Sequence, residues 1–355
     1  MDNFSSKLIE WYKENGRDLP WRQTRDPYKI WISEVILQQT RVAQGYEYYL
    51  NFIHRFPDFQ TLAAADEDEV MRYWQGLGYY SRARNLHEAA RSLSRLGYFP
   101  ETYQEVRALK GVGDYTAAAI CSFAYNQPHA VVDGNVYRVL SRYYAIEEPI
   151  DSSEGKKMFA ALAQEIMSKD FPAIYNQAIM DLGALVCTPA SPRCEDCPLA
   201  DTCLACHRKQ CSAFPVKKKK VKVTDRFFYY IYIYNSTSTF ICKRQQADIW
   251  RNLYDLPLVE TKEPMTEVEF LHSKELSAFR KNTGLDSLSV EMELLEKGLK
   301  HVLSHQRIHA SFYGIRVPEG FESLSGYQRV DIAELYNFPV SRLINQFFSV
   351  FLATK

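Results

Sequence analysis

Apolar residues recur at helical spacing through the first part of the chain, up to about residue 214. An Asp26-Pro27 pair, an N-cap followed by proline, marks the start of one helix. Further helices are predicted at residues 61–74, 81–96 and 154–168. The pattern predicts an all-α first domain over residues 1–214.

The period of the pattern changes after a lysine-rich linker at residues 215–225. Alternating aromatic and β-branched runs predict strands at 227–235, 239–244 and 309–317, the first two joined by a polar NSTS turn. We therefore expect an α+β second domain over residues 226–355.

One carboxylate interrupts the most apolar helix, in KIWISEVILQQT, residues 29–40. Apolar side chains fall on nearly every face of this helix, so Glu34 should be buried. Burial raises the pKa of a carboxyl group. Most buried glutamates are paired structural groups, but a glutamate that holds its proton can also act as an acid.

Composition excludes some classes of protein. The 355 residues are 46% hydrophobic and 14% aromatic, enough for two domains with sizeable cores. The chain has no apolar stretch of the ~18 residues that a membrane helix needs. Its charged N-terminal stretch lacks the features of a signal peptide, so we expect an intracellular protein without membrane contact.

Charge gives no general basic surface. The chain has 43 Lys+Arg and 43 Asp+Glu, of which 23 and 27 lie in residues 1–214. Nucleic-acid binding would therefore use backbone amides and a local arginine surface. The candidate arginines are Arg82, Arg84, Arg91, Arg138 and Arg142.

A glycine turn leads into an alanine-rich helix in LKGVGDYTAAAI, residues 109–120. Glycine permits positive φ and close approach of the backbone, and the free N–H groups at a helix start attract a phosphate. Gly111, Val112 and Gly113 therefore suit a helix-hairpin-helix clamp on a DNA backbone. An isolated turn of this kind is more often an ordinary loop.

Asp133 and Asn135 stand where a helix begins in VVDGNVYRVLSR, residues 131–142. The helix dipole and capping bonds favour the ionised form of Asp133, and a plain N-cap accounts for it in isolation. A protonated glutamate and an ionised aspartate are, however, the pair that glycosidic cleavage needs. The sequence alone does not bring Glu34 and Asp133 together.

Six of the eight cysteines lie in the 25 residues that end at Cys211. In a reducing compartment this density favours a metal or cluster site over disulfides. The pattern that suits a [4Fe–4S] cluster is Cys187-x6-Cys194-x2-Cys197-x5-Cys203. Zinc held by two C-x2-C pairs, the second being Cys203 and Cys206, is the alternative, although zinc ribbons usually separate their pairs by roughly 15–20 residues.

Together the motifs resemble the endonuclease III superfamily of DNA glycosylases and, within it, the MutY family of adenine DNA glycosylases. The stretches that carry the resemblance are RDLPWR (17–22), SEVILQQTRV (33–42), GLGYYSRARN (76–85), GVGDYTAAAI (111–120), VDGNVYRVLSR (132–142) and NQAIMDLGALVC (176–187). The resemblance implies an all-α helix-hairpin-helix glycosylase domain with an iron–sulfur loop at 187–203. It also implies a monomer in the bacterial cytoplasm, at the nucleoid, that acts on double-stranded DNA containing A:8-oxoG or A:G mispairs.

The resemblance implies a role for each matching residue. Glu34 would protonate N7 of an adenine flipped out of the duplex, and Asp133 would stabilise the oxocarbenium ion, supported by Tyr115 and Asn135. The remaining implied positions are Trp21, Arg22 and Gln177 around the adenine, Gln39 and Tyr79 in the gap that base flipping opens in the DNA duplex, and Thr40 and Leu77 at the opposite base.

One position separates members of the superfamily. Bifunctional members carry a Schiff-base lysine just after the hairpin, where this chain has Tyr115. A tyrosine cannot form an imine, and Lys110 lies before the hairpin. The resemblance therefore implies a monofunctional glycosylase.

The second domain shows a weaker resemblance, carried by IWRNLYDLPLVE (249–260) and HVLSHQRIHASF (301–312), to the C-terminal domain of the same family, which has a MutT (Nudix)-like fold. Residues 263–285 lack the glutamate pattern of the Nudix hydrolase box, so we expect no pyrophosphohydrolase activity. Ser304 and His305 would read 8-oxoguanine, with Leu303 where the family has an aromatic residue. A surface turn before a strand is the alternative for His305.

Three other functions compete with adenine removal. A thymine or uracil mismatch glycosylase would share the cysteine pattern and Tyr115 but lack the second domain. A non-catalytic DNA scanner with a cluster would not need Glu34 and Asp133, and a Nudix hydrolase would need metal-binding glutamates.

Overall fold

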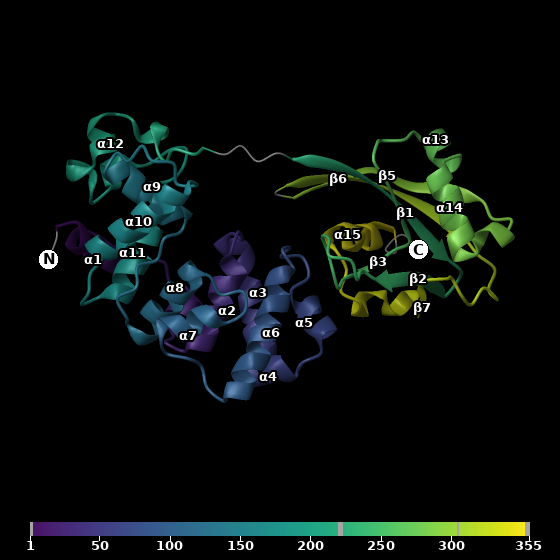
Figure 1. Ribbon diagram of the computed structural model, residues 1–355, viewed down its shortest axis with the longest axis horizontal. Helices are drawn as coiled ribbons and strands as arrows, with labels where there is room; N and C mark the ends of the chain where they lie inside the picture. Colours follow the sequence, from purple (N-terminus) through teal and green to yellow (C-terminus); the bar gives the residue numbers. More distant parts are fainter. Residues whose placement is uncertain (1–2, 219–222, 304, 352–355) are drawn as a thin grey trace. The chain divides into compact units, whose positions relative to one another are not determined.

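The computed structural model describes residues 3–218, 223–303 and 305–351 and divides the chain into two compact units (Figure 1). The helical unit comprises residues 1–65 and 84–220, and the sheet unit comprises residues 66–83 and 221–355. The segment 66–83 thus groups with the sheet unit, which the hydrophobic pattern does not indicate.

The helical unit contains α-helices and short 3-10 turns, in agreement with the expected all-α domain. The helices are α1 (Asn3–Asn15), α2 (Pro27–Leu37), α3 (Val42–Arg55), α4 (Phe59–Ala64), α6 (Ser81–Leu96, whose first turn lies in the sheet unit), α7 (Tyr103–Ala108), α8 (Asp114–Tyr125), α9 (Gly134–Tyr143), α10 (Ser153–Ile166), α11 (Pro172–Leu185) and α12 (Leu204–His207). The 3-10 turns are η1 (Pro20–Arg22), η2 (Cys194–Asp196), η3 (Ala200–Thr202) and η4 (Cys211–Ala213). Side chains of α1, α8, α9 and α11 form one apolar core.

Helix α2 forms as its sequence predicts. The Asp26 side chain accepts a hydrogen bond from Tyr28 N at 2.9 Å, and Pro27 occupies the first turn. Eight of its eleven residues are buried, among them Glu34. The predicted helices at 81–96 and 154–168 are confirmed by α6 and α10.

The single helix predicted at 61–74 is wrong. Two helices occupy this region, α4 and α5 (Glu67–Tyr73). Ala65 is extended, with ψ of 153°, and the Asp66 side chain caps α5 by accepting from Asp68 N at 2.8 Å. The acidic run therefore starts a new helix, because carboxylates satisfy and stabilise the free N–H groups of a first turn.

Among its described residues the sheet unit contains seven strands: β1 (Thr224–Tyr234), β2 (Ser238–Lys243), β3 (Tyr254–Asp255), β4 (Leu258–Thr261), β5 (Met292–Val302), β6 (Gln306–Arg316) and β7 (Gln328–Asp331). The main order is β3-β2-β1-β6-β5, with β4 paired to β1 and β7 to β2. β1 and β6 run parallel, and the other pairs are antiparallel. The three strands predicted from the sequence correspond to β1, β2 and β6.

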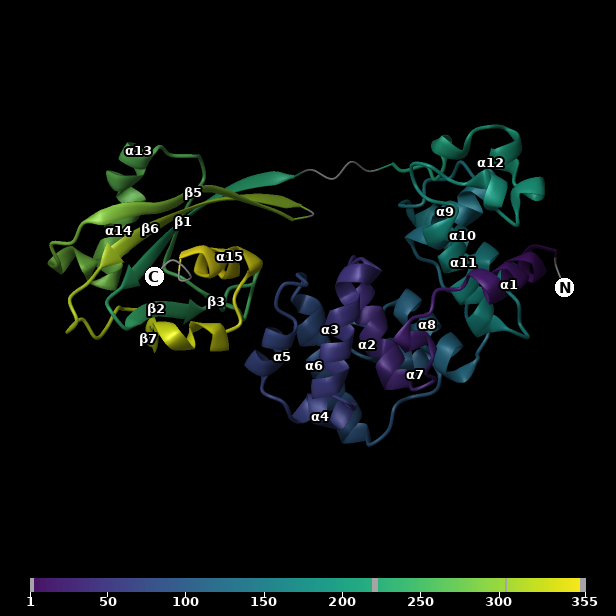
Figure 2. The same cartoon turned by 180° about the vertical axis from the view of Figure 1, so that it is seen from behind.

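Helices cover both faces of this sheet (Figure 2). They are α13 (Glu267–Leu271) and α14 (Lys274–Thr283) on one face and α15 (Arg342–Phe351) on the other, with 3-10 turns at Leu285–Ser287 and Ile332–Asn337. Alternation along β1 explains the division, since Tyr229 stacks on Phe270 of α13 at 4.2 Å while Tyr232 meets Phe347 of α15 at 5.8 Å. Within the described residues, no helix combines the length and apolarity that a membrane span requires.

Candidate active site

A cavity of about 590 Å³ lies in the helical unit. The walls come from η1, α2, the start of α8, the start of α9 and α11. Eight of the predicted site residues line it together: Trp21, Arg22, Glu34, Thr40, Tyr115, Asp133, Asn135 and Gln177. The fold therefore gathers side chains that the sequence spreads over more than 150 positions.

Glu34 is 8% exposed, and its Oε2 atom accepts a hydrogen bond from the Tyr115 hydroxyl at 2.8 Å. Burial raises the pKa of Glu34 to about 7, partly offset by the Tyr115 hydrogen bond and the charge of Arg22. The charge of Asp133 acts in the same direction as burial. Glu34 is therefore a carboxyl group that exchanges its proton near neutral pH.

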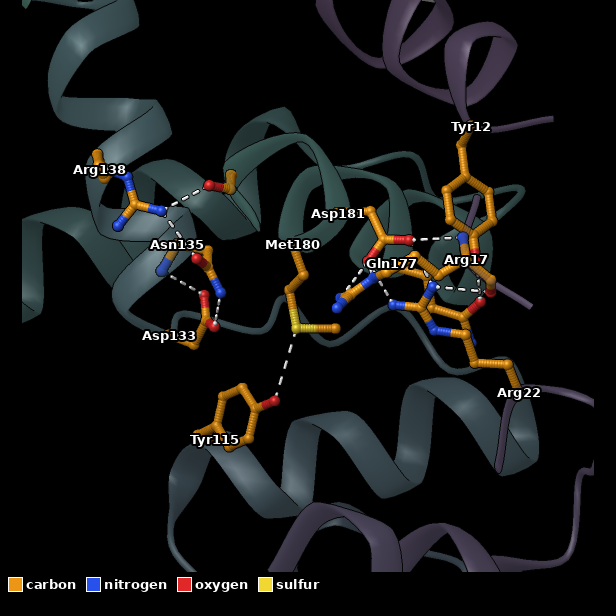
Figure 3. A network of polar contacts seen from close by, with 11 residues as sticks. Tyr12, Arg17, Arg22, Tyr115, Asp133, Asn135, Arg138, Gln177, Met180 and Asp181 are labelled. Carbon is orange, nitrogen blue, oxygen red and sulfur yellow. Dashed lines mark hydrogen bonds and ion pairs between the residues drawn. The ribbon is translucent and has the colours of Figure 1, made fainter. Parts of the chain in front are cut away.

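The Tyr115 hydroxyl has two neighbours, the Glu34 carboxyl group at 2.8 Å and the Met180 sulfur at 3.5 Å. Figure 3 shows the contact with Met180. A hydroxyl has one proton. It donates to Glu34 when that carboxyl group is ionised, and it can accept from Glu34 and turn toward sulfur when Glu34 is protonated. Burial, followed by the charge of Glu34, raises the pKa of Tyr115, so the phenol stays neutral.

Asp133 caps α9 and accepts three hydrogen bonds, two of them from Asn135 (Figure 3). The donors are Asn135 N at 2.9 Å, Val136 N at 2.8 Å and the Asn135 side-chain amide at 2.7 Å. The predicted cap is thus present. Burial nevertheless raises the pKa of Asp133 against the effect of these donors, a contribution that the position at a helix start does not reveal.

Asn135 is held on both sides. Its side-chain oxygen accepts from Arg138 Nη2 at 2.8 Å, and α11 passes close to it at Gly183. A Cβ atom at Gly183 would stand 2.6 Å from Asn135 Cβ, so a larger residue would displace the start of α9. The Asp133–Asn135 pair is therefore placed by packing as well as by capping.

Asp181 of α11 is a member of the site region that sequence reasoning missed (Figure 3). It is fully buried and accepts from Arg17 Nε at 2.9 Å and from Arg22 Nη2 at 2.7 Å. Burial alone would raise the pKa of Asp181, but the hydrogen bonds from Arg22 and Arg17 lower it overall. The available signal was the same as for Glu34, a lone carboxylate in an apolar helix.

Tyr12 closes the same network. Its hydroxyl donates to Gln177 Oε1 at 2.7 Å, and Arg22 lies over its ring at 5.7 Å from the centroid. Arg22 and Gln177 therefore reach the cavity from positions set by Asp181 and Tyr12 rather than as free side chains.

The predicted hairpin joins α7 to α8. Gly111 has φ of +76°, and a Cβ atom there would lie 2.6 Å from Asn85 Cβ. Val112 is buried, and Gly113 is the N-cap of α8 without a side-chain capping bond. The first N–H groups of α8 thus follow a turn that only glycine accommodates easily.

The remaining predicted residues lie elsewhere. Gln39 is exposed, has φ of +58° and lines a second hollow that also includes Glu34 and Tyr115. Leu77 is buried and Tyr79 is 45% exposed, both in the segment that groups with the sheet unit.

His305 is exposed in the β5–β6 hairpin, where its carbonyl accepts from Thr224 N at 3.0 Å. Ser304 lies outside the described residues.

Arg138 and Arg142 are two of the candidate arginines for a nucleic-acid surface, and the structure corrects this. They are 9% and 1% exposed. Arg138 donates to the Gly183 and Cys187 carbonyls, and Arg142 to the Thr188 and Pro189 carbonyls. Gly183 carries one of the last carbonyls of α11, and the other three acceptors lie in the loop that follows, so the two arginines supply donors to the end of α11 and to this loop.

The six cysteines that follow α11 all line one hollow: Cys187, Cys194, Cys197, Cys203, Cys206 and Cys211. Arg142 Nη1 lies 3.3 Å from the Cys187 sulfur, so a positive charge faces this thiol. No group of three or more His, Cys, Asp or Glu side chains among the described residues is placed to hold a single metal ion. Sulfurs around one hollow beside a guanidinium are compatible with the anionic thiolates of an iron–sulfur cluster, in which each thiolate binds a different iron.

The fold and site define a DNA glycosylase of the helix-hairpin-helix class. Residues 32–168 match the HhH-GPD superfamily of base excision DNA repair proteins, and residues 229–349 match the NUDIX domain. An adenine DNA glycosylase of Buchnera aphidicola (subsp. Schizaphis graminum) is 34% identical over 80% of this chain and 82% of the relative. The chain belongs to the adenine DNA glycosylase family, as its motifs predict.

Other comparisons cover a smaller share of the chain. The human adenine DNA glycosylase is 44% identical, over 58% of this chain and 40% of the human protein. Two solved structures each resemble the chain over 58% of its length. The first, a thermostable thymine-DNA glycosylase, has a TM-score of 0.54 and 29% identity, with 95% of that chain covered. The second, a trapped endonuclease III–DNA covalent intermediate, has a TM-score of 0.51 and 22% identity, with 94% of that chain covered. The second shows the fold alone.

Proposed function

We propose that the protein removes adenine from double-stranded DNA where adenine faces 8-oxoguanine or guanine, by hydrolysis of the N-glycosidic bond. Family membership supports adenine as the base. The observation that carries the chemistry is Glu34, a buried acid with a pKa of about 7 in the same cavity as Asp133. These are the two carboxyl groups, in two environments, that glycosidic cleavage requires.

The adenine must leave the base stack before a side chain can reach its glycosidic bond. A cavity of about 590 Å³ lies within the usual range for small-ligand pockets, roughly 300–1,000 Å³. Trp21 provides an aromatic wall, and Arg22 and Gln177 provide polar groups for the base edge. Because Asp181 and Tyr12 hold the last two in place, the pocket is preorganised before adenine enters.

Glu34 is the general acid in this proposal. With a pKa of about 7, about half of the Glu34 side chains carry a proton at pH 7. Transfer of that proton to adenine N7 neutralises the negative charge that would otherwise develop on the departing base. The carboxylate that remains accepts from Tyr115 and can then orient and deprotonate the attacking water.

Asp133 stabilises the sugar cation. Its oxygens accept hydrogen bonds from three N–H groups, which suits an ionised carboxylate because that group can only accept. A negative charge fixed at the start of α9 faces the positive charge that develops at the sugar as the bond breaks. Asn135 holds this carboxylate and is itself held by Arg138.

The protein is a monofunctional glycosylase in this proposal. The described lining of the cavity contains no lysine that could attack the sugar as an amine. Lys110 is exposed, and its Nζ atom lies 3.9 Å from Glu88 Oε1. Strand cleavage would therefore await alkali or another enzyme.

An iron–sulfur cluster held by Cys187, Cys194, Cys197 and Cys203 belongs to the proposal. Their sulfurs line one hollow, with the Arg142 guanidinium at 3.3 Å from Cys187. When bound, the cluster supplies four metal–sulfur bonds that join the end of α11 to the short turns after it. Cys206 and Cys211 line the same hollow and are not among the four proposed ligands.

We assign recognition of 8-oxoguanine to Ser304 and His305 of the NUDIX-like domain. Thr40 and Leu77 contact the opposite base. Gln39 and Tyr79 fill the gap that base flipping opens in the DNA duplex. Gly111, Val112 and Gly113 form the turn that brings the DNA backbone to the first N–H groups of α8. We also propose that the protein acts as a monomer at the bacterial nucleoid.

A thymine or uracil mismatch glycosylase is the second candidate, because the thermostable thymine-DNA glycosylase of known structure is 29% identical to the chain. That match covers 58% of the chain, whereas the Buchnera relative covers 80%.

The test uses duplexes with A opposite 8-oxoguanine, A opposite G, A opposite T, T opposite G and U opposite G, with and without hot alkali. Cleavage only after alkali, greatest for A opposite 8-oxoguanine, is the expected result. Cleavage without alkali would contradict the monofunctional mechanism. Activity confined to T or U opposite G would favour the second candidate.

A further inference from the structure

Segment 66–83, which carries Leu77 and Tyr79, is attached to the sheet unit at its beginning. Asp68 of α5 accepts from Lys243 Nζ through one oxygen and from the Tyr254 hydroxyl at 3.1 Å through the other. Both charged side chains are about one-third exposed, at 29% for Asp68 and 34% for Lys243. Next to this pair, Asn252 Nδ2 donates to Glu67 Oε1.

The same segment is attached again beyond α5. Gln75 Oε1 accepts from Val340 N at 3.2 Å, and the Tyr80 hydroxyl donates to Val340 O at 3.4 Å. Val340 forms a parallel bridge with Tyr254, so both attachments reach one surface of the sheet unit. We call this surface, formed by Lys243, Asn252, Tyr254 and Val340, the β3 surface.

The loop between Gln75 and Tyr80 has an unusual backbone that needs such support. Gly76, Gly78 and Tyr79 have φ of +96°, +75° and +47°. A non-glycine residue in the left-handed region costs roughly 1–2 kcal/mol, so Tyr79 keeps this conformation only where its surroundings impose it. Tyr79 is nevertheless 45% exposed.

Contacts within the segment hold the Tyr79 ring. Trp74 Nε1 and Arg82 Nη2 both donate to Gly78 O at 3.2 Å. The Arg82 guanidinium lies 5.2 Å from the Trp74 ring centroid and 5.7 Å from that of Tyr79. These contacts brace the loop internally, and the two attachments at Asp68 and at Val340 flank it on the sheet unit.

The connection between β2 and β3 also contacts the β5–β6 hairpin, to which 8-oxoguanine recognition is assigned above. Trp250 packs against His301, at the end of β5, with ring centroids 5.6 Å apart. Arg226 joins Asp248 of this connection to Gln306, the first residue of β6, at 2.8 and 3.2 Å. Residues 244–255 therefore contact the base of the hairpin on one side and segment 66–83 on the other.

We propose that the NUDIX-like domain positions the Tyr79 loop through the β3 surface, with Asp68 and Lys243 as positioning residues. On this proposal the domain that reads the opposite base also sets the place of the aromatic side chain that fills the opened helix. The proposal rests on the proposed function for its effect on base release, but the attachment itself does not.

The test is a charge exchange in the full-length protein with its cluster. Asp68→Lys places two cations together, and we expect it to slow single-turnover adenine release from an A:8-oxoguanine duplex by roughly tenfold, because small misplacements of positioning groups have effects of this size or larger. Adding Lys243→Asp restores an ion pair and should recover most of the rate. Glu263→Lys, an equal charge change at an exposed residue of the same unit, is the control.

A double-mutant cycle separates positioning from general damage. In a Tyr79→Ala background, Asp68→Lys should have little further effect if it acts through Tyr79. Additive losses, a failed rescue by Lys243→Asp, or equal rates for Asp68→Lys and Glu263→Lys would each overturn the proposal.

Hydrogen exchange of the amides of residues 76–80 gives a measurement independent of catalysis. Asp68→Lys should exchange these amides faster, and adding Lys243→Asp should reverse the effect. This result is expected whether or not the protein releases adenine. Absence of adenine release by the wild-type protein would refute the proposed function alone. Unchanged exchange would refute the attachment.

Discussion

Replacing Glu34 by glutamine should have opposite effects on catalysis and on stability. Glutamine has nearly the same shape and can still accept from Tyr115, but it has no acidic proton. Loss of general acid catalysis typically lowers a rate by ~10²–10⁴-fold. We expect a decrease in this range for adenine release under single-turnover conditions.

The stability effect follows from the pKa. A shift from 4.5 in the unfolded chain to about 7 in the folded protein corresponds to ~3 kcal/mol. Because the folded pKa is raised, this contribution is fully present below pH 4.5 and is lost as the pH rises through 7. Glu34→Gln should therefore unfold at a higher temperature than wild type at pH 8, while the two should agree at pH 4.5.

The pH dependence of the wild-type rate gives the sharpest measurement. The protonated fraction of an acid with a pKa of about 7 falls about tenfold between pH 6 and pH 8, so the rate should fall by the same factor. This limb should vanish in Glu34→Gln and persist in Glu165→Gln, an exposed control on α10. A flat wild-type profile, or destabilisation of Glu34→Gln at pH 8, would refute the reasoning.

Three further outcomes are expected. Tyr115→Phe removes a hydrogen bond that lowers the pKa of Glu34, so the descending limb of the pH–rate profile should move to higher pH; a shift to lower pH would contradict this. Gly111→Ala meets both a positive φ and a close contact, so duplex affinity should fall while Tm drops by a few degrees, as about 1 kcal/mol predicts; unchanged affinity in a binding titration would separate the hairpin from DNA. Cys187→Ser should abolish the visible absorbance and iron content of purified protein, and Cys206→Ser should retain both; colourless wild-type protein with zinc would refute the cluster.

Local features of this protein could be read from its sequence because they depend on neighbouring residues. The Asp26 cap, the 81–96 helix and the alternating faces of β1 follow from periodicity and from side chains a few positions away. The burial of Glu34 followed from the apolar residues of its own helix. The single helix predicted at 61–74 is wrong because Asp66 caps a new helix, and periodicity does not distinguish a capping aspartate from one inside a helix.

Only the tertiary structure decided what these parts do together. Tyr115 reaches Glu34 across 81 positions, and Asp181 meets Arg17 across 164. The pKa of Glu34 depends on desolvation by all the elements around the cavity, and no sequence period encodes that sum. The parallel pairing of β1 with β6 and the grouping of residues 66–83 with the sheet unit likewise arise from contacts between distant segments, which periodicity and capping do not describe.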